Sequence, residues 1–500
     1  MEYLMSGMAL IMTVGALSCL LIGVVIGVIV GALPGLGSVV GITLCLPFTF
    51  SMDKVSAIAL LLGVYAGSVY GGSISAVLIN TPGTPASAAT CFDGFPMAKS
   101  GHSEKALGWA TMASVFGGLF SCAVLLFAAP QLAALAMKFG PVETCALILL
   151  GLTCISTVSE KSQFKGIFAG TVGLMLSIVG QDPMTGDERF TFNFFALSGG
   201  MDLIAVLVGI FALSEVFIRI DIVVRENVGN IIKCSGLILP RLAEWKGRFV
   251  LLLKSSIIGS LIGVLPGTGS SAAAFISYGE AKRTSPRKEN MGKGEPDGII
   301  APEAANNAVT GGALVPSLAL GLPGDAVTAV MLATLIMHGV TPGVRLMVDS
   351  PDIVYSIFIA LCIANLLLIP IGYLVAKGFA WMLKLPESLL LPIISLLCLL
   401  GSYSVRNSFV DLWTTVIMGF VGVIFRYFKI PLAPLVIGLV LGMQFEISLR
   451  QSLIITNGSL QSMIFDHPIA AGLIVAVVFL LLAPVIKNIL GRKKEAAAEQ

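Results

Sequence analysis

Charged side chains are scarce in this chain of 500 residues. Only 12% of its residues are Asp, Glu, Lys or Arg, whereas about 25% is usual for a soluble domain. Hydrophobic residues make up 56%, and the mean hydropathy is +0.96. A water-soluble surface needs far more charge, so the composition excludes a soluble protein and predicts that most of the chain lies in a lipid bilayer. The net charge of +2 excludes a general electrostatic nucleic-acid binder.

Residues typical of metal and catalytic sites are equally sparse. The three histidines stand far apart, and the nine cysteines form no CxxC pair, which argues against a zinc site, a haem site or a disulfide framework. A GxxxxGK[ST] phosphate loop is missing, so ATP hydrolysis by this chain is excluded. Ser/His/Asp spacing, an Arg-rich voltage-sensor helix and a TVGYG filter are missing too. No cofactor is indicated beyond a coupling cation, Na⁺ or H⁺.

Long apolar stretches and many glycines and prolines are what the chain does have, with 55 Gly and 24 Pro. A membrane-crossing helix needs about 20 apolar residues. Irregular apolar segments, expected to contain broken helices, cover 8–50, 55–92, 250–279 and 301–338. Ordinary membrane helices are expected at 106–130, 142–157, 166–181, 201–218, 353–376, 387–402, 411–425, 431–445 and 467–486.

The distribution of Lys and Arg predicts the orientation. If alternate loops and the C-terminal tail are cytoplasmic, they hold 23 of the 30 basic residues, and the opposite loops hold 6. This places the C-terminus in the cytoplasm and the N-terminus outside. It requires 8–50 and 250–279 to be re-entrant hairpins, the second with arms of about 15 residues that reach roughly 22 Å. If 8–31 crosses the bilayer fully, the N-terminus lies inside instead.

The chain also repeats itself. Gly31-Ala-Leu-Pro-Gly-Leu-Gly-Ser38 matches Gly263-Val-Leu-Pro-Gly-Thr-Gly-Ser270 at six of eight positions. Each copy is followed by a second Pro-Gly break, within Asn80–Pro85 and within Gly321–Asp325. The charge count gives corresponding loops opposite sides, so the two halves are inverted. Inverted repeats with paired helix breaks indicate a secondary transporter whose site lies near the membrane midplane.

These repeats predict an all-α polytopic membrane protein of two inverted repeats, each with a re-entrant hairpin, a Pro-Gly-broken helix and a helical block. Two transport parts and two helical blocks, the first a scaffold part, are then separated by a linker. The predicted boundaries are 1–105 (first hairpin and broken helix), 106–218 (first helical block), 219–249 (cytoplasmic linker), 250–345 (second hairpin and broken helix), 346–486 (second helical block) and 487–500 (basic cytoplasmic tail).

The breaks carry most of the candidate binding residues. Backbone groups freed by Pro and Gly cannot face lipid, so they are buried in protein or line a cavity. A half-helix N-terminus suits an anion, and carbonyl and hydroxyl oxygens suit Na⁺, expected here near Ser38, Asn80, Thr268 and Asp325. The candidates are Pro34, Gly35, Gly37, Ser38, Asn80, Thr81, Pro82, Gly83, Thr84, Pro266, Gly267, Thr268, Gly269, Ser270, Ser271, Pro323, Gly324 and Asp325. A kink that serves only packing remains the alternative for these breaks.

Three further candidates are Glu303, Asn306 and Asn307, which share one helix face at spacings of three and four residues. The alternative for Glu303 is a charge at the start of a helix, stabilised by the helix dipole. For Asp325 the alternative is a helix N-cap, which is compatible with a binding role. Asp93 and Lys99 bound the first cytoplasmic loop and are interpreted as solvated or gate-forming residues.

The same strings resemble a known family. Gly31–Ser38, Tyr70–Ser73, Asn80–Ser87, Asp93–Pro96, Gly263–Ser270, Ala301–Asn307, Gly321–Gly324, Leu439–Gly442 and Glu446–Arg450 are similar to the large membrane subunit (TctA type) of the tripartite tricarboxylate transporters. The resemblance covers nearly the whole chain. It implies a multi-pass protein of the bacterial inner membrane, with an elevator-like fold, that works with a small membrane subunit and a periplasmic solute-binding protein. A dimer is left open.

The leading hypothesis is therefore a transporter subunit that imports a di- or tricarboxylate, coupled to Na⁺ or H⁺. The alternative class is an ion channel or a membrane-embedded enzyme. A channel needs a continuous polar lining, and an enzyme needs a nucleophile–base pair. The sequence supplies neither, whereas it does supply two matched pairs of breaks.

Overall fold

The computed structural model describes residues 2–157, 163–223, 232, 234–343, 345–382 and 387–482. They form two compact units. Unit 1 is Met1–Ala134 with Asp202–Ile424, and unit 2 is Leu135–Met201 with Phe425–Gln500. The predicted tail and part of the predicted linker lie outside the described residues. The boundaries expected between transport and scaffold parts stay predictions.

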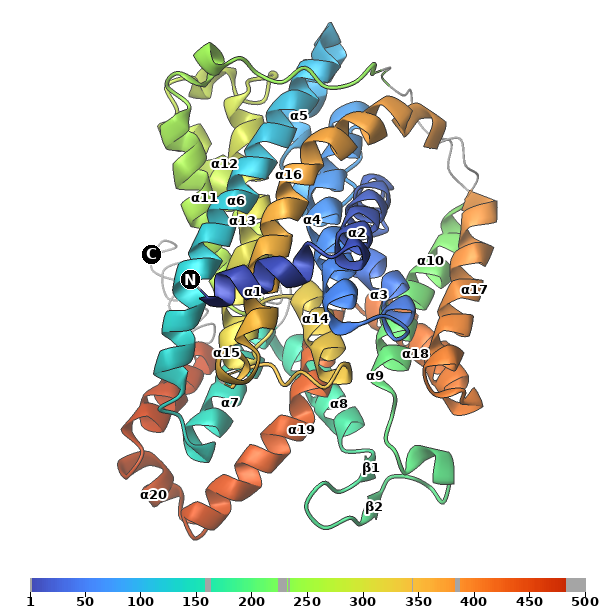
Figure 1. Ribbon diagram of the computed structural model, residues 1–500, viewed down its shortest axis with the longest axis vertical. Helices are drawn as coiled ribbons and strands as arrows, with labels where there is room; N and C mark the ends of the chain where they lie inside the picture. The colour runs from blue at the N-terminus through green and yellow to red at the C-terminus, as the bar shows by residue number, and fades with distance from the viewer. Residues whose placement is uncertain are drawn as a thin grey trace, which may run out of the picture. The chain divides into compact units, whose positions relative to one another are not determined.

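The regular elements described in unit 1 are all helices (Figure 1). Its first stretch holds α1 (Glu2–Ile11), α2 (Val14–Ala32), α3 (Gly37–Thr49), α4 (Lys54–Ile79), η1 (Pro85–Ala88), α5 (Cys91–Met97), η2 (Ala98–His102) and most of α6 (Ser103–Ala136). Its second stretch begins with α9 (Leu203–Leu207), η4 (Val208–Leu213), α10 (Ser214–Val223), η5 (Leu242–Trp245), α11 (Phe249–Val264), α12 (Gly269–Thr284) and η6 (Lys288–Asn290). It continues with α13 (Asp297–Leu320), α14 (Ala326–Met337), α15 (Leu346–Asp349), α16 (Pro351–Met382), α17 (Glu387–Arg406) and most of α18 (Phe409–Tyr427).

Unit 2 is smaller. It contains α7 (Pro141–Thr157), α8 (Gln163–Ser177), η3 (Phe195–Leu197), α19 (Leu432–Ile455), α20 (Leu460–Phe465) and a last helix, Pro468–Leu482. Two short strands, β1 (Gly180–Gln181) and β2 (Glu188–Arg189), pair in antiparallel fashion with Gly180 opposite Arg189.

The expected all-α polytopic membrane fold is confirmed at this level. Among the described residues, eight helices are long and apolar enough to cross a membrane. The helices expected at 106–130, 353–376 and 431–445 are found but run further, as α6, α16 and α19. The first hairpin has unequal arms, because α2 has 19 residues and α3 has 13. The second has equal arms of 16 residues each, which span about 24 Å.

Helices α2 and α4 touch backbone to backbone and run in the same direction, since Gly23 lies against Leu60 and Gly31 against Ser68. Glycines at four-residue spacing make this approach possible: Gly23, Gly27 and Gly31 on α2, and Gly63, Gly67 and Gly71 on α4. A Cβ on Gly27 would lie 2.5 Å from the carbonyl oxygen of Val64. Small residues repeating every fourth position are how membrane helices pack closely where no hydrophobic effect drives them together.

The second half packs its equivalent pair in the same way. A Cβ on Gly259 of α11 would lie 2.2 Å from the carbonyl oxygen of Ala305 on α13, and Gly263 lies against Val309, Gly312 and Ala313. In each half, therefore, the first arm of the hairpin packs alongside the first arm of the broken helix. These broken-helix arms form the core of unit 1, since α4 is buried from Ser56 to Leu78 and α13 from Asp297 to Ala319.

Candidate functional site

The two Pro-Gly breaks of the first half lie against each other. A Cβ on Gly83 would lie 1.9 Å from the carbonyl oxygen of Gly31, and the Gly83 N–H donates to the carbonyl of Gly72 at 3.4 Å. On the other side of the hairpin tip, the Arg219 guanidinium of α10 donates to the carbonyl of Pro34 and contacts Gly35. The predicted residue Gly83 thus lies against the end of α2, whereas Pro34 and Gly35 lie against Arg219.

The breaks of the second half meet in the same manner. The N–H of Gly267, at the hairpin tip, donates to the carbonyl of Gly324 in the broken helix at 2.7 Å. The Thr268 hydroxyl also donates to two carbonyls just before it, those of Ile262 at 2.6 Å and Leu265 at 2.9 Å. Pro-Gly breaks at matched positions therefore bring hairpin tip and broken helix together in both halves.

The halves also cross over. The second arm of each hairpin lies against the segment after the other half's break: α3 contacts α14, and α12 contacts η1. A hydrogen bond joins the halves at the second break, where the buried Tyr65 hydroxyl of α4 donates to Oδ2 of Asp325 at 2.8 Å.

The N-termini of the half-helices differ in whether they are already capped. Asp325 Oδ1 accepts the N–H of Thr328 at 2.7 Å, so the predicted N-cap of α14 is confirmed. Thr84 and Ser87 form a capping box on η1. In contrast, α3 and α12 begin without any side-chain cap among the described residues.

Serines follow both uncapped N-termini. Ser38 in α3 and Ser270 and Ser271 in α12 are half-buried, and their hydroxyls bond to no other described residue. Uncapped N–H groups beside free hydroxyls are donors suited to an anion. The predicted residues Gly37, Ser38, Gly269, Ser270 and Ser271 therefore provide two sets of donors without a side-chain cap.

Other predicted residues lie apart from this arrangement. Asn80 ends α4 in the left-handed conformation, with φ of 54°, and is exposed, as is Thr81. Glu303, Asn306 and Asn307 lie within α13, buried, and Glu303 is beyond the first helical turn. The alternative of a helix-start charge for Glu303 is wrong, because Asp297 is the acid in that turn.

Asp93 is fully buried, so its interpretation as a solvated residue is wrong. Its Oδ1 accepts three backbone N–H groups, from Gly292 at 2.7 Å and from Gly294 and Glu295 at 2.9 Å. Its Oδ2 accepts the Tyr278 hydroxyl at 3.0 Å. Asp93 of the first half thus fastens α5 to the segment that leads into α13 of the second half.

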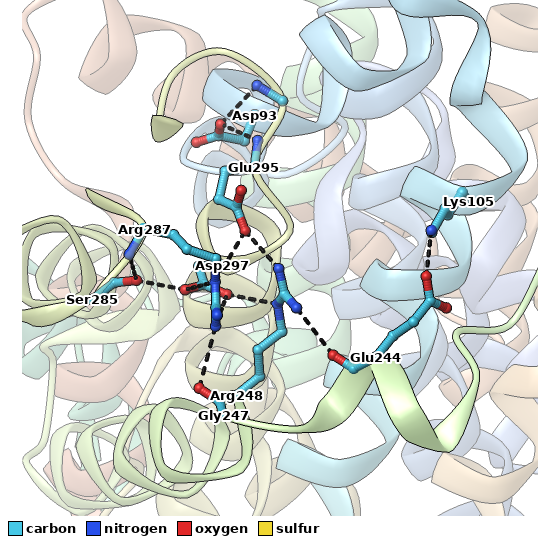
Figure 2. Close-up of polar contacts among 10 residues, drawn as sticks. Asp93, Lys105, Glu244, Gly247, Arg248, Ser285, Arg287, Glu295 and Asp297 are labelled. Carbon is cyan, nitrogen blue, oxygen red and sulfur yellow. Dashed lines mark hydrogen bonds and ion pairs between the residues drawn. The ribbon is translucent and has the colours of Figure 1, made fainter. Parts of the chain in front are cut away.

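A charged network continues from this point to the base of the second hairpin (Figure 2). Arg248, just before α11, binds Asp297 Oδ1 at 2.8 Å and Glu295 Oε1 at 2.7 Å. Arg287, after α12, binds the other oxygen of Asp297 at 3.1 Å. The network thereby ties both ends of the second hairpin to the start of α13.

Lys105 of α6 joins the same network by binding Glu244, and it holds the pKa of that carboxyl below its usual range. The Glu244 backbone carbonyl accepts a bond from Arg248 at 3.0 Å. The Arg248 guanidinium also lies over the Trp109 ring, 5.4 Å from its centroid, as a cation–π contact.

Replacing Arg248 by alanine is expected to lower the free energy of unfolding by about 2 kcal/mol. Hydrogen bonds to charged groups contribute about 1.5–3 kcal/mol, and Arg287 would still bind Asp297. Arg248→Lys should recover only part of the lost stability, because an ammonium lacks the planar fork that binds both carboxylates. Thermal unfolding in detergent measures the change.

The control is Arg283→Ala. The Arg283 side chain is 75% exposed and pairs with Glu280 on its own helix, so its loss should change the free energy by about 0.5 kcal/mol or less. If both alanine variants lose the same free energy of unfolding, the network around Arg248 does not stabilise the fold more than an exposed ion pair does.

Unit 2 has a charged cluster of its own in the Glu446–Arg450 motif. Arg450 binds Asp182 at 2.8 Å and Glu446 at 2.7 Å, and Arg189 binds Glu446 at 2.6 Å. The backbone N–H of Met184, together with Arg450, lowers the pKa of Asp182 to about 2. This part of the sequence pattern therefore fixes the β1–β2 hairpin to α19.

Sequence reasoning missed several residues of the site. Tyr65 reaches Asp325, and Thr90 and Ser114 reach Glu303, from segments far away in the sequence. Ser114 lies in a stretch expected to be an ordinary membrane helix. The available signal was a hydroxyl inside an apolar span, which is a weak one because Ser and Thr also bond within their own helix.

Comparison with known proteins supplies the family. The model of the tripartite tricarboxylate transporter TctA family matches residues 17–437. An uncharacterized 52.8 kDa protein in the TAR-I ttuC' 3' region of Agrobacterium vitis is 35% identical over 471 residues, which is 93% of each chain. An uncharacterized protein in the TAR-II ttuC' 3' region of the same organism is 34% identical over 233 residues, covering 46% of this chain and 96% of its own length. No solved structure matches the chain. The chain therefore belongs to the tripartite tricarboxylate transporter TctA family, whose members are membrane components of a transporter and not enzymes.

Proposed function

We propose that this chain is the membrane subunit of a binding-protein-dependent secondary active transporter that imports a di- or tricarboxylate, driven by a Na⁺ or H⁺ gradient. Membership of the family implies a carboxylate substrate, a periplasmic binding protein and a small membrane subunit. The inner membrane of a bacterium, a cytoplasmic C-terminus and elevator-like movement of the two hairpins are parts of the same proposal.

One observation carries the proposal: the uncapped N-termini of α3 and α12, each followed by a serine with a free hydroxyl in the described chain. A carboxylate oxygen can accept both a backbone N–H and a serine O–H. In this proposal each donor set receives one carboxylate group of a substrate that has at least two. The other two half-helix N-termini are already capped, that of α14 by Asp325 and that of η1 by Thr84 and Ser87.

Uptake of labelled carboxylates into proteoliposomes tests this function. The full chain is reconstituted with the small subunit, a cognate binding protein is supplied outside, and a Na⁺ gradient or a pH gradient is imposed. We expect saturable, gradient-dependent uptake of at least one di- or tricarboxylate. Failure with every carboxylate and both gradients, in a preparation shown to be folded, would overturn the proposal.

Within that assay, Ser38→Ala and Ser270→Ala are each expected to raise the KM for the carboxylate about 10-fold or more. A hydrogen bond to a charged group contributes about 1.5–3 kcal/mol, and 1.4 kcal/mol corresponds to a factor of ten. The matched control is Ser395→Ala, since the Ser395 hydroxyl bonds the Leu391 carbonyl in its own helix. A KM that is unchanged in both hairpin variants would refute this placement of the substrate.

A further inference from the structure

A buried carboxylate without a counter-charge lies at the centre of unit 1. Glu303 of α13 is 0% exposed. Its Oε2 accepts the Ser114 hydroxyl of α6 at 3.0 Å, and its Oε1 accepts the Thr90 hydroxyl from the segment before α5. Ser73 of α4 lies beside the same carboxyl group, although its buried hydroxyl makes no hydrogen bond within the described chain. Glu303 is thus surrounded by hydroxyl groups from three other segments.

No ion pair involving Glu303 is found among the described residues, and its bonded neighbours are uncharged. An isolated charge in a low-dielectric interior is very unfavourable, and an acid within a membrane span is retained where it binds a proton, a cation or a partner. Unlike Glu303, the buried Asp297 has two arginines. The local deficit at Glu303 is therefore one positive charge.

Two amide oxygens within the next four residues of α13 lack a donor. Asn306 is 1% exposed and Asn307 is fully buried, and the side-chain Oδ1 of each has no partner in the described structure. Their orientations are fixed, because Nδ2 of Asn306 donates to the Val69 carbonyl at 3.3 Å and Nδ2 of Asn307 to the Glu303 carbonyl at 3.1 Å. Flipping either amide would set two acceptors against each other.

These groups share one side of α13. At 3.6 residues per turn, Glu303, Asn306 and Asn307 fall within an arc of about 100°. Asn306 faces α4, where Val69 lies one turn before Ser73. Apart from the Ser73 hydroxyl, which can donate or accept, the deficits in this region have the same sign: a carboxylate lacks a cation, and two carbonyl oxygens lack donors.

We propose that Glu303, Asn306 and Asn307, with the hydroxyls of Ser73, Thr90 and Ser114, form a binding site for a monovalent cation, with Na⁺ as the candidate. A proton would neutralise Glu303 but would satisfy at most one of the orphaned amide oxygens. Carboxylate, amide and hydroxyl oxygens are ligands that hard cations prefer. One negative charge matches one monovalent cation and leaves a neutral buried site.

This inference rests on the proposed function for its role, because the bound cation would be the coupling ion. It moves the cation away from the breaks at Ser38, Asn80, Thr268 and Asp325, where the sequence pattern had suggested it. The site draws on α4, the segment before α5, α6 and α13, so cation binding would tie the broken helices of both halves together.

Cation-dependent thermal stability tests the site without any transport. The purified full chain is titrated with NaCl against choline chloride at constant ionic strength, with KCl and LiCl as further arms, and pH is varied separately. We expect Na⁺ to raise the Tm by about 3 °C at saturation, with K⁺ less effective. Glu303→Gln keeps the shape and removes the charge, so it should abolish the Na⁺ response and melt no lower than sodium-free wild type.

Two variants complete the test. Asn307→Ala should weaken the apparent Na⁺ affinity at least 10-fold, whereas Asp325→Asn should retain the response. Loss of the response in Asp325→Asn but not in Glu303→Gln would place the cation at the break and overturn the proposal. Stabilisation by low pH with no difference between Na⁺ and choline would identify a proton site and overturn it as well.

The two proposals fail separately. Na⁺ binding that depends on Glu303, in a chain that takes up no carboxylate, would contradict the proposed transport and leave the cation site standing. Carboxylate uptake driven by a pH gradient alone, with no Na⁺ effect on Tm, would overturn the cation site and leave the proposed transport standing.

Discussion

Asp93→Ala is expected to lower the free energy of unfolding by about 3–5 kcal/mol and to abolish carboxylate uptake. Asp93 is fully buried and accepts three backbone N–H groups and one tyrosine hydroxyl. Each buried donor left without a partner costs about 1–3 kcal/mol, and the four losses are not additive. The substitution also removes a connection between the two halves, because Asp93 lies on α5 and its partners belong to the second half.

Two matched variants show whether the stability depends on the hydrogen bonds of Asp93 or on its charge. In Asp93→Asn the amide oxygen can still accept the three N–H groups, so we expect a loss of only about 1–2 kcal/mol. Tyr278→Phe removes a single hydroxyl and should cost about 1 kcal/mol. Thermal or denaturant unfolding in detergent gives the stability, and proteoliposome uptake gives the activity. If the Asp93→Ala variant is as stable as wild type, Asp93 does not hold the two halves together.

Gly83→Ala is expected to reduce uptake about 100-fold and to destabilise the chain by about 3 kcal/mol. The added Cβ would lie 1.9 Å from the carbonyl oxygen of Gly31 and 2.9 Å from the Cα of Gly72, both of which are backbone atoms that cannot rotate away. The hairpin tip and the break must therefore separate. Overpacking of this kind costs about 1–3 kcal/mol, and a displacement of about 1 Å at a binding site can cost about 100-fold in rate.

The control for Gly83→Ala is Gly279→Ala in α12, where a Cβ would meet nothing within 4 Å. Alanine is favoured over glycine in a helix by about 1 kcal/mol, so this variant should be neutral or slightly stabilised. If Gly83→Ala transports as well as Gly279→Ala, the contact between the first two breaks is not needed for transport.

Much of the helical layout could be read from the sequence because it depends on local chemistry. An apolar run long enough to cross a bilayer forms a helix, and proline followed by glycine ends it. The helices expected at 411–425 and 387–402 are found as α18 and α17 with nearly the same starts. Most errors lie at ends where tertiary contacts extend a helix. For example, α19 continues past 445 through Glu446 and Arg450, which are neutralised by Arg189 and Asp182. The helix expected at 166–181 instead begins earlier and ends at Ser177, because Gly180 and Gln181 form β1.

The sequence by itself determined that the chain is a membrane protein, where its helices break, and that the breaks come in matched pairs. These follow from composition and from the backbone chemistry of Pro and Gly, which act within a few residues. Tertiary structure alone decided what each polar side chain does. Asp93 is a buried clamp and not a solvated loop residue, Asp325 caps its own helix, and Glu303 meets Thr90 and Ser114 from distant segments. The reason is that a polar group in an apolar interior is defined by its partners, and those partners are brought to it by the fold.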